Sequence, residues 1–290
     1  VKELLSWRNI DVNAETKIKK TPLIVACEKG NKEIVEILIN YNDEKKSSKK
    51  GRKTQNNSID FNAKTVDGKS ALLISCEYLR LDIAEMLVNI DEIECDDASD
   101  DGKTPLCYAC EKGSEYLASE LINHNADVNH HTKDNKTPLY FACLSRNSKI
   151  IQNIINKIDD NSQINLIETT NGTSPLFITC QNGDLDSYNL LNNEIDNNSN
   201  IDYRDKSGRT PLYAACEGEN TEIVESLLTK FNANSDIADK EGKTPLHVAC
   251  EKKNTELVFL LLNHSSNDLN INKNGTMLLH LKLLVKKEAL

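Results

Sequence analysis

The amino-acid sequence predicts an all-α repeat solenoid, built from stacked helix–turn–helix units that are joined by β-hairpin-like loops. The first observation is a Thr-Pro-Leu motif, or a close variant, that recurs with an underlying period of 33 residues. The second is that all six prolines directly follow the first residue of such a motif, which we call the anchor. The third is that seven of the nine cysteines lie six residues after an anchor. The anchors are Thr21, Ser70, Thr104, Thr137, Ser174, Thr210 and Thr244, with Met277 in the equivalent place near the end.

Each anchor predicts the start of a first helix. A Thr or Ser side chain accepts a hydrogen bond from the free N–H groups of the first turn. Proline fits the position after it, because its missing N–H would have no partner there. A leucine then points one large apolar group inward, and a pair of small residues such as Ala109 and Cys110 lets neighbouring helices approach closely.

A second helix and a turn complete each unit. Apolar residues return with helical spacing, as in Ile223, Val224, Leu227 and Leu228. Asp/Asn-rich segments then lead to a glycine two residues before five of the anchors, which predicts a turn. One such unit cannot bury its apolar face alone, so contacts between neighbouring units must form the core.

The motif Thr-Pro-Leu-His-Val-Ala at 244–249, together with the 33-residue period, resembles the ankyrin repeat. The resemblance covers essentially the whole chain, although the histidine is replaced after the other six Thr or Ser anchors. It divides residues 1–290 as one array: 1–20, the tail of a preceding partial repeat; 21–69, a repeat with a basic insertion at 41–58; the repeats 70–103, 104–136, 137–173, 174–209, 210–243 and 244–276; and 277–290, a degenerate terminal repeat.

The resemblance implies a protein-binding surface, because ankyrin-like arrays are curved and use hairpin tips and first helices to line a concave groove. By position, the predicted partner-binding residues are Asp67, Glu77, Tyr78, Asp100, Asp101, Glu111, Lys112, Lys133 and Asp134. Their acidic members predict a partner with a basic segment. Tyr140, Phe177 and Tyr213 lie on consecutive first helices and are either groove residues or packing residues between repeats.

Two functions from different classes follow from this resemblance. The first is a non-enzymatic protein–protein interaction scaffold, which we expect to be a monomer. The alternative is a targeting or regulatory ankyrin segment of a larger multidomain protein, such as an enzyme. A third hypothesis is a purely structural array, whose fold matters more than any groove.

The net charge and the cysteines limit which partners and which cellular compartment we expect. The net charge of −10 argues against nucleic acid as the main partner, and no apolar run is long enough for a transmembrane segment. Periodic cysteines on stacked helices are too far apart for disulfides, so we expect free thiols and a reducing, cytoplasmic compartment.

Catalytic, metal and cofactor sites are not expected. The sequence has no Gly-rich phosphate loop, no G-x-S-x-G motif and no H-E-x-x-H motif. Cys107 and Cys110 form a C-x-x-C inside a first helix, without a second pair at zinc spacing. His130 and His131 are adjacent in a turn and are expected to be solvated.

The insertion at 41–58 is rich in lysine and almost free of apolar side chains, so we expect a disordered loop. It is either a tolerated surface insertion or a functional basic patch, in which Lys49–Lys53 allows nuclear entry. The stretch between Leu81 and Gly102 has nine acidic residues and no basic one. It is either a solvated edge, a docking face, or an internal partner of the basic insertion.

Overall fold

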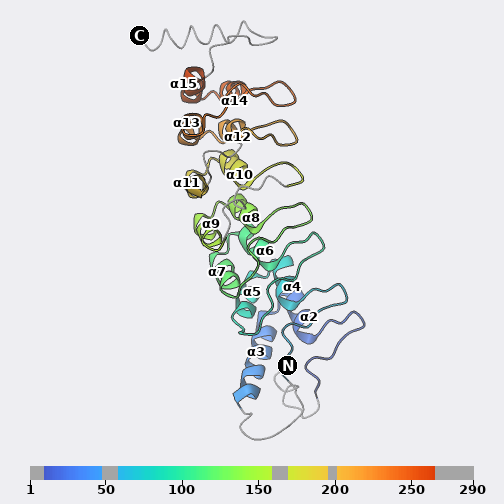
Figure 1. Cartoon of the computed structure of the whole chain (residues 1–290). Helices are drawn as coiled ribbons and strands as arrows, with labels where there is room; N and C mark the ends of the chain where they lie inside the picture. The colour runs from blue at the N-terminus through green and yellow to red at the C-terminus, as the bar shows by residue number, and fades with distance from the viewer. Residues whose placement is uncertain (1–9, 48–57, 159–168, 195–200, 265–290) are drawn as a thin grey trace. The chain divides into compact units, whose positions relative to one another are not determined.

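The computed structural model describes residues 10–47, 58–158, 169–194 and 201–264, and helices are the only regular secondary structure in these ranges (Figure 1). The chain divides into two compact units, Val1–Ile158 (unit 1) and Asp159–Leu290 (unit 2). The predicted terminal segments 1–9 and 265–290 lie outside the described residues. The all-helical repeat architecture predicted from the sequence is confirmed.

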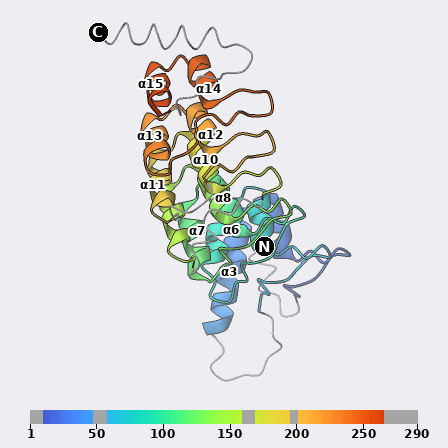
Figure 2. The ribbon, with the colours of Figure 1, turned by 45° about the horizontal axis from the view of Figure 1, so that its top comes forward.

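Unit 1 has four helix pairs in its described residues. They are α2 (Pro22–Lys29) with α3 (Lys32–Ser47), α4 (Ala71–Glu77) with α5 (Leu81–Val88), α6 (Pro105–Lys112) with α7 (Glu115–Asn123), and α8 (Pro138–Ser145) with α9 (Ser148–Ile155). The first helices pack on one another in chain order and form one row, and the second helices form another. The loops that precede α4, α6 and α8 project to the same side of these rows (Figures 1 and 2).

Unit 2 repeats this arrangement with three described helix pairs. They are α10 (Pro175–Asn182) with α11 (Leu185–Glu194), α12 (Pro211–Glu217) with α13 (Thr221–Thr229), and α14 (Pro245–Glu251) with α15 (Thr255–His264). Within this unit α10, α12 and α14 are stacked, and so are α11, α13 and α15. Helices α10 and α12 therefore each contact both their own second helix and the first helix of the next repeat.

The anchors act as predicted. From Thr21 to Thr210, each anchor hydroxyl accepts a hydrogen bond from the backbone N–H three residues later. At the last anchor the ring Nδ1 of His247 accepts a bond from the backbone N–H of Thr244. All six prolines occupy the first turn of a first helix. The anchor sequence thus sets where each repeat begins.

The loops between repeats form a ladder of backbone and asparagine hydrogen bonds. At the tips, the N–H of Val66 donates to the carbonyl of Ile18 (3.2 Å), and the N–H of Lys133 donates to that of Asp101 (3.1 Å). Further from the tips, Asn62 Oδ1 accepts from the backbone N–H of the following repeat while its amide donates to a carbonyl there. Some asparagines of this asparagine-rich chain therefore join consecutive repeats.

The first part of the insertion is helical, so the prediction of a loop over all of 41–58 is wrong. Helix α3 continues to Ser47, because Asn42-Asp43-Glu44-Lys45-Lys46 contains no glycine or proline and ends in good helix formers. The buried Asn42 also binds the chain beyond the insertion, since its Oδ1 accepts from the N–H of Ile59 at 3.1 Å. Residues 48–57, including Lys49–Lys53, lie outside the described residues.

The core of each unit consists of the leucines after the anchors, the small residues of the first helices and the aliphatic residues of the second helices. All nine cysteines are free, and eight of them are buried. Ser187 stands on α11 where other repeats have an aliphatic residue, and it is buried with its hydroxyl bonded to Asp184. The repeat thus satisfies a buried polar group within its own turn.

Candidate protein-binding surface

The predicted binding residues all belong to unit 1, on loop tips and on the ends of first helices. Asp67, Asp100, Asp101, Lys133 and Asp134 lie on the tips, and all five are exposed. Glu77, Tyr78, Glu111 and Lys112 lie at or just after the last turn of α4 or α6. Tyr78 and Lys112 are exposed there, whereas Glu77 and Glu111 are partly buried.

The first two described repeats enclose a small hollow between their loop tips and first helices. Its volume is about 60 Å³, well below the roughly 300–1,000 Å³ of small-molecule pockets. The lining residues are Lys20, Glu28, Thr65, Asp67, Lys69, Ile74, Glu77 and Tyr78. The structure thus brings together three of the predicted residues, namely Asp67, Glu77 and Tyr78.

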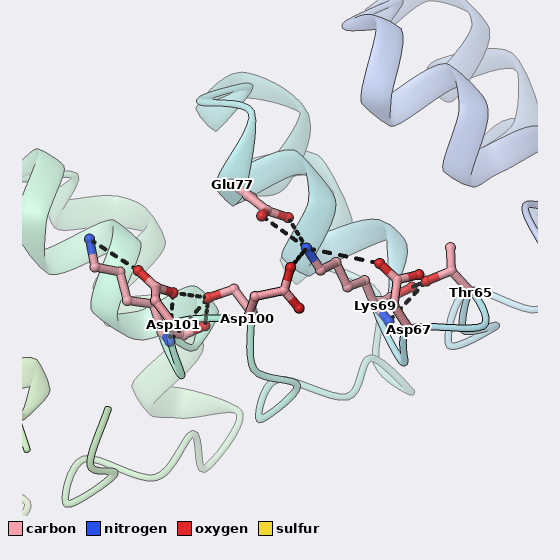
Figure 3. A network of polar contacts seen from close by, with 8 residues as sticks. Thr65, Asp67, Lys69, Glu77, Asp100 and Asp101 are labelled. Atoms are coloured by element: carbon pink, nitrogen blue, oxygen red, sulfur yellow. Dashed lines mark hydrogen bonds and ion pairs between the residues drawn. The ribbon is translucent and has the colours of Figure 1, made fainter. Parts of the chain in front are cut away.

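Lys69 lies at the centre of the polar contacts beside this hollow (Figure 3). Its Nζ lies 3.0 Å from Glu77 Oε1, 3.3 Å from Asp100 Oδ2 and 4.0 Å from Asp67 Oδ2. Burial lowers the pKa of Lys69, but the hydrogen bonds and charges of Glu77 and Asp100 outweigh it and raise the pKa. One lysine thus joins the loop tip on which it lies to the following first helix, α4, and to the next loop tip.

Asp67 and Asp101 are held as carboxylates by their own turns. A hydrogen bond from the Thr65 hydroxyl is the main reason that the pKa of Asp67 is lowered (Figure 3). Partial burial raises the pKa of Asp101, but hydrogen bonds from the Ser99 hydroxyl and the Lys103 N–H outweigh this effect, so the pKa is lowered overall. Both groups therefore present negative charge at neutral pH.

The ion pair between Lys69 and Glu77 recurs through the array, and the sequence reasoning missed it. A cation directly before the anchor binds a carboxylate seven residues after it, because the first helix brings the two side chains to the same face. The further pairs are Lys20–Glu28, Lys103–Glu111 (3.1 Å), Arg209–Glu217 (3.1 Å) and Lys243–Glu251 (3.0 Å). The signal was present as a Lys or Arg before six of the seven described anchors.

Aromatic rings hold several of these cations from the other side. Lys103 Nζ lies 5.3 Å from the ring centre of Tyr108 on the following helix, α6, and 4.9 Å from that of Phe141 on α8. In unit 2, the guanidinium of Arg209 lies 5.3 Å from the ring of Phe177. Cation–π contacts between neighbouring repeats, such as those of Lys103 with Phe141 and of Arg209 with Phe177, favour the packing of those repeats.

Three aromatic residues of the first helices, which the sequence left as either groove residues or packing residues, are packing residues. Tyr140, Phe177 and Tyr213 are 6%, 0% and 5% exposed. The hydroxyl of Tyr213 donates to Asp239 Oδ2 at 2.9 Å. These rings stabilise their repeats and offer little surface to a partner.

The tips of the third and fourth described repeats carry mixed charge. Lys136 Nζ lies 3.7 Å from Asp134 Oδ2 and 5.6 Å from the ring centre of Tyr140. Lys133 neighbours Asp101 through its backbone bond to that residue. Positive and negative groups alternate over this part of the tips, whereas negative groups dominate around the hollow.

The histidines and cysteines that the sequence analysis considered as metal ligands do not form a metal-binding cluster in the described residues. The ring Nε2 of His130 donates to the carbonyl of Gly102 at 2.8 Å, so His130 joins two repeats and is not a freely solvated residue, while His131 is exposed. Burial raises the pKa of Cys107 and Cys110. No cluster of three metal-binding side chains occurs in the ranges that the structure describes.

These features define a repeat protein that is all-helical in its described residues, with stacked first helices and stacked second helices within each unit. A family model described as ankyrin repeats (3 copies) matches residues 1–98, 90–166, 158–239 and 220–281. The chain therefore belongs to the ankyrin-repeat family. No curated protein matches it. None of the helices in the described ranges is long and apolar enough to span a membrane.

Proposed function

We propose that this chain is a non-enzymatic scaffold that binds a partner protein through the loop tips and first helices of unit 1. The main support is that Asp67, Tyr78, Asp101 and Asp134 are exposed on a regular frame whose core is made by other residues. Ankyrin repeats in general mediate protein–protein interactions, and their shared frame leaves such surface positions to determine the partner.

The proposal includes a monomeric, cytoplasmic protein whose partner carries a basic segment. The free, buried cysteines favour a reducing compartment. The carboxylates at Asp67, Asp100 and Asp101 favour a cation on the partner and should speed its association.

The test is a charge reversal on the proposed face. The variant carries Asp67→Lys, Asp101→Lys and Asp134→Lys, and its control carries Glu36→Lys, Asp91→Lys and Glu120→Lys. The control makes the same change of charge on the second helices and the segment after them. Both variants should keep the helical circular-dichroism spectrum of the parent chain.

Proteins captured from a lysate of the source cell should be shared by the parent chain and the control, and should be lost from the tip variant. If all three chains capture the same proteins, the binding face lies elsewhere and the proposal fails.

A further inference from the structure

Exposed apolar side chains gather on the first two described repeats. Ile18 and Val66 lie on adjacent loop tips that are joined by a backbone hydrogen bond, and they are 53% and 68% exposed. Tyr78, at the edge of the hollow, is 50% exposed. Single exposed apolar residues are ordinary, but a group of neighbours indicates a contact surface.

The fold does not require these apolar residues. Ile18 stands three residues before its anchor, where the tips of the third and fourth described repeats carry Asp101 and Asp134. Val66 stands four residues before its anchor, where those two repeats carry Asp100 and Lys133. Those repeats form the same turn, with a bond between consecutive tips. The aliphatic tips therefore have no evident role in the turn itself, and a role in contact with another molecule accounts for them.

The charges around this apolar group favour a cation. Two lysines and three carboxylates line the hollow, and Asp100 adds a carboxylate at its edge, so negative charges exceed positive ones by two. The lysines are largely covered, since the side chain of Lys69 is 11% exposed. Asp67 and Asp100, at 60% and 86%, are the groups that face solvent.

The hollow is suited to the head of one side chain. Its wall contains a half-exposed phenol ring, Tyr78, beside carboxylates. A guanidinium is flat, stacks on aromatic rings and binds carboxylates through two parallel hydrogen bonds, whereas an ammonium does neither as well. An arginine therefore fits this combination better than a lysine.

We propose that the first two described repeats bind an extended segment of a partner protein, in which an arginine enters the hollow beside Tyr78 and an adjacent aliphatic side chain covers Ile18 and Val66. This inference rests on the proposed function and adds the chemistry of the partner. Electrostatic attraction to Asp67 and Asp100 brings the segment to the surface, and contact with Tyr78 and the aliphatic tips determines how long it stays.

The experiment selects peptides from a random 12-residue phage library on the whole chain, and measures the enriched peptides by fluorescence anisotropy. Enriched sequences should share an arginine within two residues of Leu, Ile or Val. Tyr78→Ala should weaken binding of such a peptide roughly 2- to 30-fold, in line with a cation–π contact of about 0.5–2 kcal/mol. Tyr116→Ala is the matched control, because Tyr116 is 49% exposed on α7, and it should leave binding unchanged.

Charge is tested separately. Asp67→Asn with Asp100→Asn should weaken binding at low salt and reduce its salt dependence, and Arg→Lys in the peptide should weaken binding as well. The inference is overturned if no peptide is enriched, if enriched peptides lack a cation, or if Tyr78→Ala and Tyr116→Ala have equal effects. The lysate capture above judges the proposed function independently, since a tip variant that loses its proteins would support that function even without an arginine-binding hollow.

Discussion

Replacing Gly183 by alanine should destabilise unit 2 far more than the same change at Gly113 destabilises unit 1. Both glycines end a first helix in the left-handed region, with φ of 64° and 67°. A Cβ on Gly113 would meet nothing closer than 3.8 Å, whereas a Cβ on Gly183 would lie 2.4 Å from the carbonyl oxygen of Gly218. The two sites thus share a backbone conformation and differ in their neighbours.

The expected magnitudes follow from these two effects. The left-handed conformation costs about 1–2 kcal/mol for alanine, and the lower entropy of the unfolded chain offsets about 0.4–1 kcal/mol of it. Gly113→Ala should therefore cost about 1 kcal/mol. A close contact in a packed site adds about 1–3 kcal/mol, so Gly183→Ala should cost about 2–4 kcal/mol.

A third variant isolates the contact. Gly218 has an ordinary helical φ of −75°, and its Cβ would lie 2.4 Å from the carbonyl oxygen of Cys180. Gly218→Ala therefore tests the close approach of α10 and α12 without backbone strain. Its cost should lie between those of the other two variants.

Hydrogen exchange measured by mass spectrometry gives the local opening free energy for peptides that cover α10–α12 and α6–α8. Exchange in α10–α12 should accelerate in the Gly183 and Gly218 variants, with the larger effect in the former. The reasoning is refuted if Gly113→Ala costs as much as Gly183→Ala, or if Gly218→Ala changes nothing.

Three further outcomes are expected. Asn147→Ala should lower the free energy of unfolding by about 1–2 kcal/mol, because the side chain caps α9 and also donates to a carbonyl of the preceding repeat; in urea denaturation, an unchanged midpoint would contradict this. Iodoacetamide at pH 8 should alkylate Cys250 first, because the other eight thiols are buried. Burial raises the pKa of Cys27, Cys76, Cys180 and Cys250, so alkylation should accelerate with pH. Peptide mass spectrometry would contradict the expectation if the thiols reacted at similar rates. Asp97→Ala should change stability by less than about 1 kcal/mol, because one carboxylate oxygen of Asp97 is buried and has no hydrogen-bond partner among the described residues. Lys64→Met should cost more, about 1–2 kcal/mol, because it leaves that carboxylate without its cation at 2.7 Å, although the 42% exposure of Lys64 weakens the pair. Thermal melts that reverse this order would refute the expectation.

The repeat frame was predictable because its causes are local. The hydroxyl of Thr104 binds an N–H three residues away, and Pro105 fits the same turn, so a few consecutive residues determine where the helix starts. Burial of Cys110 and its counterparts follows from their fixed place on that helix. In a periodic sequence the same local signals recur in every repeat, so the helix starts are easy to recognise.

The contacts between repeats were much less predictable. Lys69 reaches Asp100, which is 31 residues away, and that contact depends on the stacking of two repeats and on the rotamers of a long side chain. The helical extension to Ser47 was missed for a different reason, because a low apolar content was interpreted as a loop although glutamate and lysine favour helix. The binding role of the surface residues stays a prediction.

The cations before the anchors also change the expected electrostatics of the surface. From the sequence, the acidic residues of the predicted binding surface indicated a partner with a basic segment. In the structure, Lys103 lies 3.1 Å from Glu111, and Lys136 lies 3.7 Å from Asp134. Coulomb energy falls with distance, and charges more than roughly 8 Å apart are screened at physiological salt. The attraction within these short ion pairs therefore outweighs the combined negative potential of carboxylates on neighbouring repeats. Attraction for a basic segment should therefore be concentrated at the hollow, where carboxylates remain in excess and exposed apolar groups can retain the segment after it arrives.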